Sequence, residues 1–312
     1  MSNSTNAIVN GLIYLFLPRL LGPFLYGQFS FLNTFFRNTA QFFDLFLSPG
    51  FYVLYNKDKS NDLPLFSYYF FCIAVFLNFL FASIIIINPD LKFYVFVKQN
   101  GIDIYLALFL GLLNWLIIIN SYIFDANNKT VYFERKRFFS KIILVILFIL
   151  LIIFDFLTIT TAFLIFIISA LYLVLLSLNK SKKIIEYKIN NNRKTFLKSF
   201  KKVFIYNSPL IKFSVLALTF TQLEILIINY FYGSEEFSFF ALSVQIGSLI
   251  FIFTASLVPL IIKKYVEDIK AKNYNLISLS FSQEVSYLFF GITFLSIFVA
   301  VHSYEFIFTI AG

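Results

Sequence analysis

The amino-acid sequence predicts an all-α, polytopic membrane protein. Hydrophobic residues make up 60% of the chain, charged residues 13%, and the mean hydropathy is +0.84. A soluble domain is nearer to about 45–50% apolar and about 25% charged. Uncharged runs of about 20 residues, the length that crosses a bilayer, recur along the chain. These runs are continuously apolar, as at Ile84–Ile87, and lack the alternation of a membrane β-barrel.

Nine helices follow from these runs. The first, Ala7–Leu17, is apolar but short, and no basic segment precedes it as in a signal peptide. The second, Ser30–Tyr55, is long enough to cross the membrane and carries Arg37 and Asp44. The third and fourth are the uncharged runs Leu63–Pro89 and Ile104–Phe124.

The next apolar stretch, Ile142–Asn179, carries only Asp155 and is too long for one crossing. It predicts two helices joined by a tight turn at Asp155. The seventh span, Val203–Tyr232, carries Lys212 and Glu224. The eighth and ninth are the uncharged runs Phe237–Ile262 and Val285–Tyr304.

The basic residues set the expected orientation, because cytoplasmic loops are enriched in Lys and Arg. With the N-terminus in the cytoplasm, 20 of the 25 Lys and Arg residues fall in inner loops and three in outer loops. Arg37 and Lys212 lie within spans. The net charge of +9 therefore reflects membrane topology, and a nucleic-acid partner is not expected.

The composition also limits the chemistry. Cys72 and His302 are the only residues of their types, so the chain cannot build a disulfide framework, a zinc site or a Ser-His-Asp triad. The sequence predicts no enzyme, no metal site and no cofactor.

Two helix joints resemble each other and indicate an internal repeat. The joint between the first two helices carries Arg19, Gly22, Pro23, Tyr26 and Gly27. A shift of 211 residues brings this segment onto the joint between helices seven and eight. The shift places Gly22 on Gly233, Tyr26 on Phe237, Gly27 on Ser238, Phe29 on Phe240 and Ser30 on Ala241. Both joints follow a helix that runs outward, so the repeat would be parallel.

The first joint, Arg-Leu-Leu-Gly-Pro-x-x-Tyr-Gly-x-Phe-Ser, resembles the opening motif of polysaccharide flippases of the Wzx type. That family belongs to the multidrug/oligosaccharidyl-lipid/polysaccharide exporter superfamily. The second joint is similar to the family pattern in Glu224, Gly233, Glu235-Glu236 and Phe237, although the family usually has Asp at the position of Glu224.

The resemblance implies two lobes of six helices. It predicts a six-helix lobe at residues 1–179, a basic cytoplasmic linker at 180–202 and an incomplete second lobe of three helices at 203–312. A chain three helices short of this plan could also be a truncated, non-functional remnant.

Ionisable residues at bilayer depth are costly, at about 2.5–3.5 kcal/mol on insertion scales. Arg37 either pairs with Asp44 or Glu224 to fix helix packing, or lines a polar cavity for an anionic substrate. Lys212 either lines the same cavity or extends to the cytoplasmic interface. The candidate substrate-binding residues are Arg37, Lys212, Asn33, Gln41, Gln222 and Gln245, and the candidate ion-coupling residues are Asp44 and Glu224.

The function that the resemblance implies is a flippase of the bacterial cytoplasmic (inner) membrane. Its substrate would be an oligosaccharide linked to undecaprenyl diphosphate, moved by alternating access for O-antigen, capsule or a related polymer. Membrane lipids, a polysaccharide polymerase and a chain-length regulator are the expected partners. The alternatives are a drug/cation antiporter of the same fold and a membrane-embedded glycan polymerase or ligase, whose large outer loop this chain lacks.

Overall fold

The computed structural model describes residues 16–44, 47–57, 62–96, 99–184, 193–249, 264–265, 274–302 and 305. These residues form helices and turns, and no strand occurs among them. Five of the helices are long and apolar enough to cross a membrane. The protein is therefore an all-α, polytopic membrane protein, as the sequence predicts.

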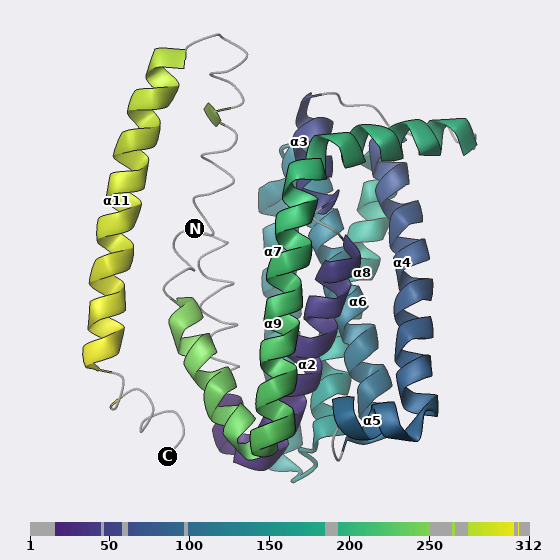
Figure 1. Cartoon of the computed structure of the whole chain (residues 1–312), viewed down its shortest axis with the longest axis vertical. Helices are drawn as coiled ribbons and strands as arrows, with labels where there is room; N and C mark the ends of the chain where they lie inside the picture. The colour runs from purple at the N-terminus through teal and green to yellow at the C-terminus, as the bar shows by residue number, and fades with distance from the viewer. Residues whose placement is uncertain are drawn as a thin grey trace. The chain divides into compact units, whose positions relative to one another are not determined.

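The chain divides into two compact units, Pro23–Ser238 and a second unit formed by Met1–Gly22 with Phe239–Gly312. The first unit contains α2 (Pro23–Asp44), α3 (Leu47–Lys57), α4 (Asp62–Ile87), α5 (Pro89–Val95), α6 (Gly101–Ala126), α7 (Thr130–Ile153), α8 (Ile159–Ile184) and most of α9 (Arg193–Leu249) (Figure 1). The second unit contains the end of α9 and α11 (Tyr274–Val301). The boundaries between these units, after Gly22 and after Ser238, differ from the predicted lobe boundaries at 179 and 202.

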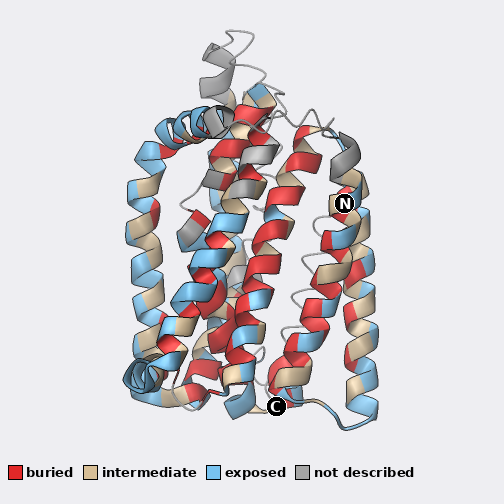
Figure 2. Cartoon of the chain, turned by 90° about the vertical axis from the view of Figure 1, so that its right-hand side faces the viewer, coloured by how far each residue is buried: buried red, intermediate tan, exposed pale blue. Residues whose placement is uncertain are grey.

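Helix α6 is the centre of the Pro23–Ser238 unit. It packs most extensively against α8 and α2, and also against α3, α4 and α7. The backbones of α6 and α2 approach closely at Gly111, where an added Cβ atom would lie 2.9 Å from the carbonyl oxygen of Phe36. Small residues permit this kind of contact between membrane helices. Figure 2 shows buried residues concentrated on the inner helices.

Aromatic rings fill the space around α2. The ring centroid of Phe29 lies 4.6 Å from that of Phe163 and 5.5 Å from that of Phe166. Farther along α2, the ring centroid of Phe35 lies 5.2 Å from that of Phe96. The many Phe residues of this chain therefore include a packed core, which tilted and edge-to-face ring contacts stabilise beyond simple area burial.

Helix α4 shows why the outer helices suit a bilayer. Its buried stripe, Ala74, Asn78, Ala82 and Ile85, has helical spacing, and the Asn78 amide donates to the Ala74 carbonyl at 2.8 Å. The other faces expose large apolar side chains, such as Ile87, which is 78% exposed. Water would disfavour such a surface, whereas lipid chains solvate it.

The turn predicted at Asp155 is confirmed. Helix α7 ends at Ile153, α8 begins at Ile159, and Asp155 adopts a positive φ of 55°. The Thr161 hydroxyl accepts from the Thr158 amide at 2.8 Å, and the Thr158 hydroxyl accepts from the Thr161 amide at 3.2 Å. These two contacts satisfy backbone donors at the start of α8.

Several predicted boundaries are wrong. The described parts of the span Ser30–Tyr55 are helical and belong to α2 and α3, with residues 45–46 outside the described part. Helix α2 already begins at Pro23, a residue that suits the first turn of a helix. The short helix α5 was not predicted. Helix α7 begins at Thr130 instead of Ile142, and α11 at Tyr274 instead of Val285. Of the first predicted helix, only its last two residues lie within the described part, and they are helical.

The predicted linker 180–202 is largely helical where it is described. Helix α8 continues to Ile184, and α9 begins at Arg193. Figure 1 shows the start of α9 crossing the end of the bundle before the helix bends, and Pro209 lies inside this helix as a source of bending. Gly233 has non-helical backbone angles inside α9, so this element is two helices joined at a kink, as the predicted seventh and eighth spans require. The kink explains how a 51-residue apolar segment, Leu197–Gly247, can exceed the length of one membrane crossing.

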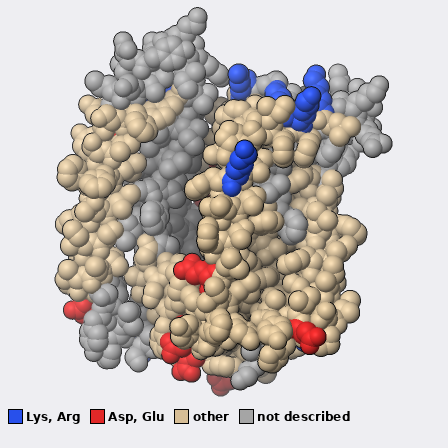
Figure 3. Space-filling model, in the orientation of Figure 1, with Lys and Arg blue, Asp and Glu red and all other residues tan. Residues whose placement is uncertain are grey.

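Charge is unevenly distributed over the Pro23–Ser238 unit. Figure 3 shows Lys and Arg gathered toward one end of the visible face of this unit, and Asp and Glu toward the other half. The basic end includes the start of α7, where Lys129, Arg135, Lys136 and Arg137 lie. The sequence rule for cytoplasmic loops predicts that this end faces the cytoplasm.

The close approach of α2 and α6 predicts the effect of Gly111→Ala. The added Cβ atom would force the Phe36 backbone to shift, so we expect a loss of about 1–3 kcal/mol in the free energy of unfolding. The matched control is Gly101→Ala, because nothing lies within 4 Å of a Cβ atom there. Thermal unfolding in detergent micelles measures both variants, and equal melting temperatures would contradict the packing described here.

Candidate functional site

The two joints that the sequence pairs have matching backbone geometry. Gly22 has a φ of 77° and Gly233 a φ of 83°, and these are the positive-φ glycines among the described residues. Glycine adopts such angles without the steric cost that other residues incur. Four residues later, Tyr26 and Phe237 are each 1% exposed. The 211-residue correspondence therefore extends from sequence to conformation at both joints.

The joints also contact each other within the Pro23–Ser238 unit. A Cβ atom at Gly27 would overlap the backbone carbonyl of Ser234. Beside this contact, the rings of Phe31 and Phe237 meet edge to face, with centroids 5.5 Å apart. Only glycine at position 27 permits this approach, so the joint motif brings α2 and α9 together. Arg19, by contrast, is exposed.

Gln222 connects α9 to α2 farther along both helices. Its Nε2 donates to the Phe35 carbonyl and to the Thr39 hydroxyl, each at 3.4 Å. The Thr39 hydroxyl in turn donates to the Phe35 carbonyl at 2.8 Å. Gln222 was predicted as a substrate ligand. The structure places its amide nitrogen in a contact between helices, which is a common role for Gln in membrane proteins.

A third contact lies nearer the predicted cytoplasmic end. The fully buried Asn207 side chain of α9 packs against Gly50 of α3, where a Cβ atom would overlap it. Contacts at Gly27, Gln222 and Asn207 therefore fix the antiparallel register of α9 against the bundle. The sequence alone could not identify this partner, because Gly50 and Asn207 are distant in the chain.

Arg37 and Gln41 lie one turn apart on an exposed face of α2, with the half-buried Thr34 on the same face. Arg37 forms no ion pair or hydrogen bond within the described residues, so the alternative pairing with Asp44 or Glu224 is not present there. Asn33, predicted beside Arg37, lies one helical turn before it and is buried.

Asp44 is a buried structural link between three helices. Its carboxylate accepts from the Ser48 hydroxyl at 2.5 Å, from the Ser48 amide at 3.3 Å and from the Trp115 indole at 2.9 Å. These donors belong to α3 and α6, so the Asp44 carboxylate connects α2 to both helices. Sequence reasoning missed Trp115, because no local pattern links it to Asp44.

Lys212 and Glu224 are both exposed on α9. Neither forms an ion pair or hydrogen bond within the described residues. Lys212 lies ten residues from Gln222, which is about 15 Å along a helix. Gln245 lies on the part of α9 that belongs to the second unit.

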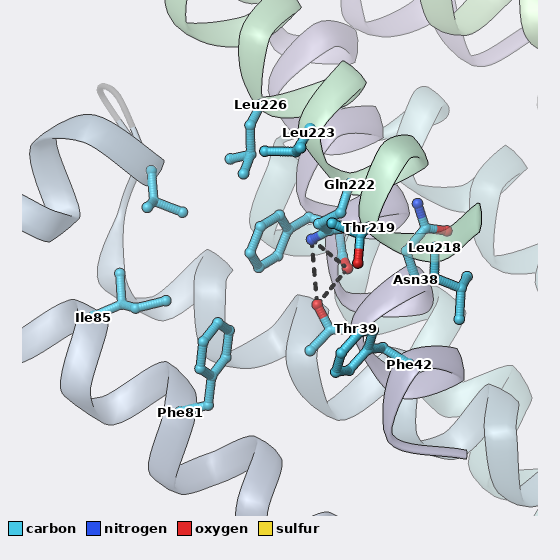
Figure 4. Close-up of a pocket in the computed structure, with 12 residues that line it drawn as sticks. Asn38, Thr39, Phe42, Phe81, Ile85, Leu218, Thr219, Gln222, Leu223 and Leu226 are labelled. Atoms are coloured by element: carbon cyan, nitrogen blue, oxygen red, sulfur yellow. Dashed lines mark hydrogen bonds between the residues drawn. The ribbon is translucent and has the colours of Figure 1, made fainter. Parts of the chain in front are cut away.

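A cavity of about 290 Å³ lies between α2, α4, α5 and α9. Figure 4 shows Phe81 and Ile85 of α4 facing Phe42 of α2 and Leu223 of α9 across it. Apolar side chains make up most of the lining, and Asn38, Thr39, Thr219 and Gln222 lie at one side. Arg37 is on a different face of α2. The cavity depends on α5 and on contacts distant in sequence, so the sequence did not predict it.

Comparisons with protein-family models, with curated proteins and with solved structures found no match. The geometry of these residues is therefore the basis for a functional proposal.

Loss of the Asp44 carboxylate should change the fluorescence emission of Trp115, which contacts it. Asp44→Ala would leave the Trp115 indole and the Ser48 hydroxyl without their acceptor, so we expect a loss of about 1–3 kcal/mol in stability. The emission of Trp115, the only Trp in the sequence, should shift at the same time.

A matched control for Asp44→Ala is Asp103→Ala. Asp103 is another buried aspartate, and it accepts from the Thr160 hydroxyl at 2.6 Å, three turns along α6 from Trp115. Asp103→Ala should lower stability without moving the emission. An unchanged spectrum in Asp44→Ala would contradict the indole–carboxylate contact.

Proposed function

We propose that this protein is a flippase that moves lipid-linked oligosaccharides across the bacterial cytoplasmic membrane by alternating access. The observation that carries the proposal is Arg37, an exposed cation without an acidic partner among the described residues, on α2, which packs against the membrane-spanning helix α6. Ten residues, or about 15 Å of helix, separate it from the joint at Gly27. An unpaired cation within a bundle of membrane helices is costly, and an anionic substrate would offset the cost.

The substrate proposed for this site is an undecaprenyl diphosphate carrying a short oligosaccharide. The diphosphate supplies the negative charge for Arg37, and the amide of Gln41 and the hydroxyl of Thr34 can hydrogen-bond sugar hydroxyls. Lys212, also exposed and unpaired among the described residues, would attract the same group nearer the cytoplasm. The two cations would thus mark two positions along the path.

The apolar cavity supports a lipid-linked substrate. Its lining of Phe, Leu, Ile and Val side chains would favour a hydrocarbon chain over a hydrated sugar. It borders α2 on a different face from Arg37. The proposed flippase can therefore keep polar and apolar parts of one substrate on different sides of the same helix.

An ion gradient would drive the cycle through Glu224 in this proposal. Its carboxylate is exposed and has no partner within the described residues, whereas three donors hold Asp44. Equal transport in proteoliposomes with and without proton and sodium gradients would remove this step. A polysaccharide polymerase and a chain-length regulator would act on the translocated product, and the basic end of the bundle would face the cytoplasm.

The exposed Glu224 also favours a second candidate, a drug/cation antiporter, because an acidic side chain attracts cationic drugs. The two functions differ in their need for Arg37. If Arg37→Ala spared glycan export but abolished drug efflux, the antiporter would be the better assignment.

The proposal predicts that Arg37→Ala lowers glycan export by about tenfold or more, since a hydrogen bond to a charged group contributes about 1.5–3 kcal/mol. Arg37→Lys retains the charge and should restore part of the export. Surface-glycan complementation in a strain lacking its own flippase measures both variants. Lys57→Ala, which removes an exposed cation at the end of α3, is the control. Full export in Arg37→Ala at normal protein levels would refute the substrate role.

A further inference from the structure

A tyrosine ring near the start of α7 is held in place by packing. Tyr132 stacks on Phe124 of α6, with ring centroids 5.9 Å apart and an angle of 23° between the planes. It borders the buried cluster formed by Phe124, Phe133 and Leu173. This packing holds the ring in place. Because the ring is only half-buried, part of it remains an accessible aromatic surface at the end of the bundle.

Two lysines from different helices converge on this ring. The Nζ atom of Lys136, one turn farther along α7, lies 5.8 Å from the ring centroid of Tyr132. The Nζ atom of Lys180, near the end of α8, lies 5.7 Å from the same centroid. Each lysine makes a cation–π contact, yet neither has an acidic partner or hydrogen bond among the described residues. Both ammonium groups therefore lie within 6 Å of one ring centroid.

The surroundings do not neutralise the two lysines. The segment from Asp125 to Lys141, taken with Lys180, contains six basic and two acidic residues. One of the acidic residues, Glu134, already pairs with Arg137 at 3.4 Å. Asp125, the other, forms no ion pair with either lysine. Among the described residues, positive charge therefore exceeds negative charge around Tyr132, and this excess favours the approach of an anion.

The position of the ring matches the headgroup layer of a membrane. The apolar segment Ile159–Lys180 of α8 ends at Lys180, which places this lysine at the boundary of the hydrocarbon. Tyr is enriched at this boundary, and cytoplasmic ends of membrane proteins carry basic residues. Anionic phospholipids in the facing leaflet attract such residues.

We propose that Tyr132, Lys136 and Lys180 form a binding site for the headgroup of an anionic phospholipid. The two ammonium groups donate to phosphate oxygens, and the Tyr132 ring fixes the distance between them. Charge-assisted hydrogen bonds of this kind are stronger than neutral ones. The site is independent of the proposed transport function, because it lies at the α7–α8 end and uses none of the residues assigned to the substrate.

The test is a titration of the full chain in a neutral detergent with phosphatidylglycerol, read by native mass spectrometry. The double variant Lys136→Gln/Lys180→Gln should bind this lipid about 30-fold more weakly, the loss expected for two charges near a membrane surface. Lys136→Arg/Lys180→Arg retains both charges and should retain binding. Phosphatidylcholine, a zwitterionic lipid, should bind weakly to every variant.

The control is Lys57→Gln/Lys198→Gln, which removes two exposed cations from the ends of α3 and α9. This pair should bind phosphatidylglycerol as the unmodified protein does. An equal loss in both double variants would show that net charge alone attracts the lipid, and the proposal would be wrong. Inorganic phosphate should compete only weakly. Displacement of the lipid by millimolar phosphate would identify a simple anion site and also overturn the proposal.

Discussion

The close approach of Gly27 to Ser234 determines where α9 lies on the bundle. Because the missing Cβ atom of Gly27 leaves room for a backbone carbonyl, the two helix joints can touch. Gln222 then reaches Phe35 and Thr39, and Asn207 reaches Gly50. Each later contact needs the register that the first contact sets. The faces presented by Arg37 and Glu224, and the cavity beside Phe42, follow from the same register.

Two buried aspartates connect helices of the bundle. Asp44 of α2 binds Ser48 of α3 and Trp115 of α6, and Asp103 of α6 binds Thr160 of α8. In a bilayer, where water cannot satisfy polar groups, such contacts decide which helices are neighbours. Arg37 forms no ion pair or hydrogen bond among the described residues, and this is the basis of the substrate role proposed for it.

Much of the fold could be predicted from the sequence. Apolar runs predicted the membrane class, and Asp155 predicted the α7–α8 turn. Gly22 and Gly233 were paired by sequence and share a positive φ. The contact of Asp44 with Trp115 was missed because the two residues lie 71 positions apart in the sequence. The substrate role of Gln222 was predicted from its polarity alone, and only the structure shows that its amide contacts α2.

A disulfide cross-link between α2 and α9 tests most directly the register in which these two helices pack. In a Cys72→Ser background, Thr39→Cys/Gln222→Cys should cross-link rapidly on mild oxidation, because the native side chains lie within hydrogen-bond distance. Thr39→Cys/Lys212→Cys, about 15 Å farther along α9, should not. Adding Gly27→Ala should slow the first cross-link, since it displaces the joint that sets the register. Absence of the Thr39–Gln222 cross-link, or equal rates with and without Gly27→Ala, would contradict the account.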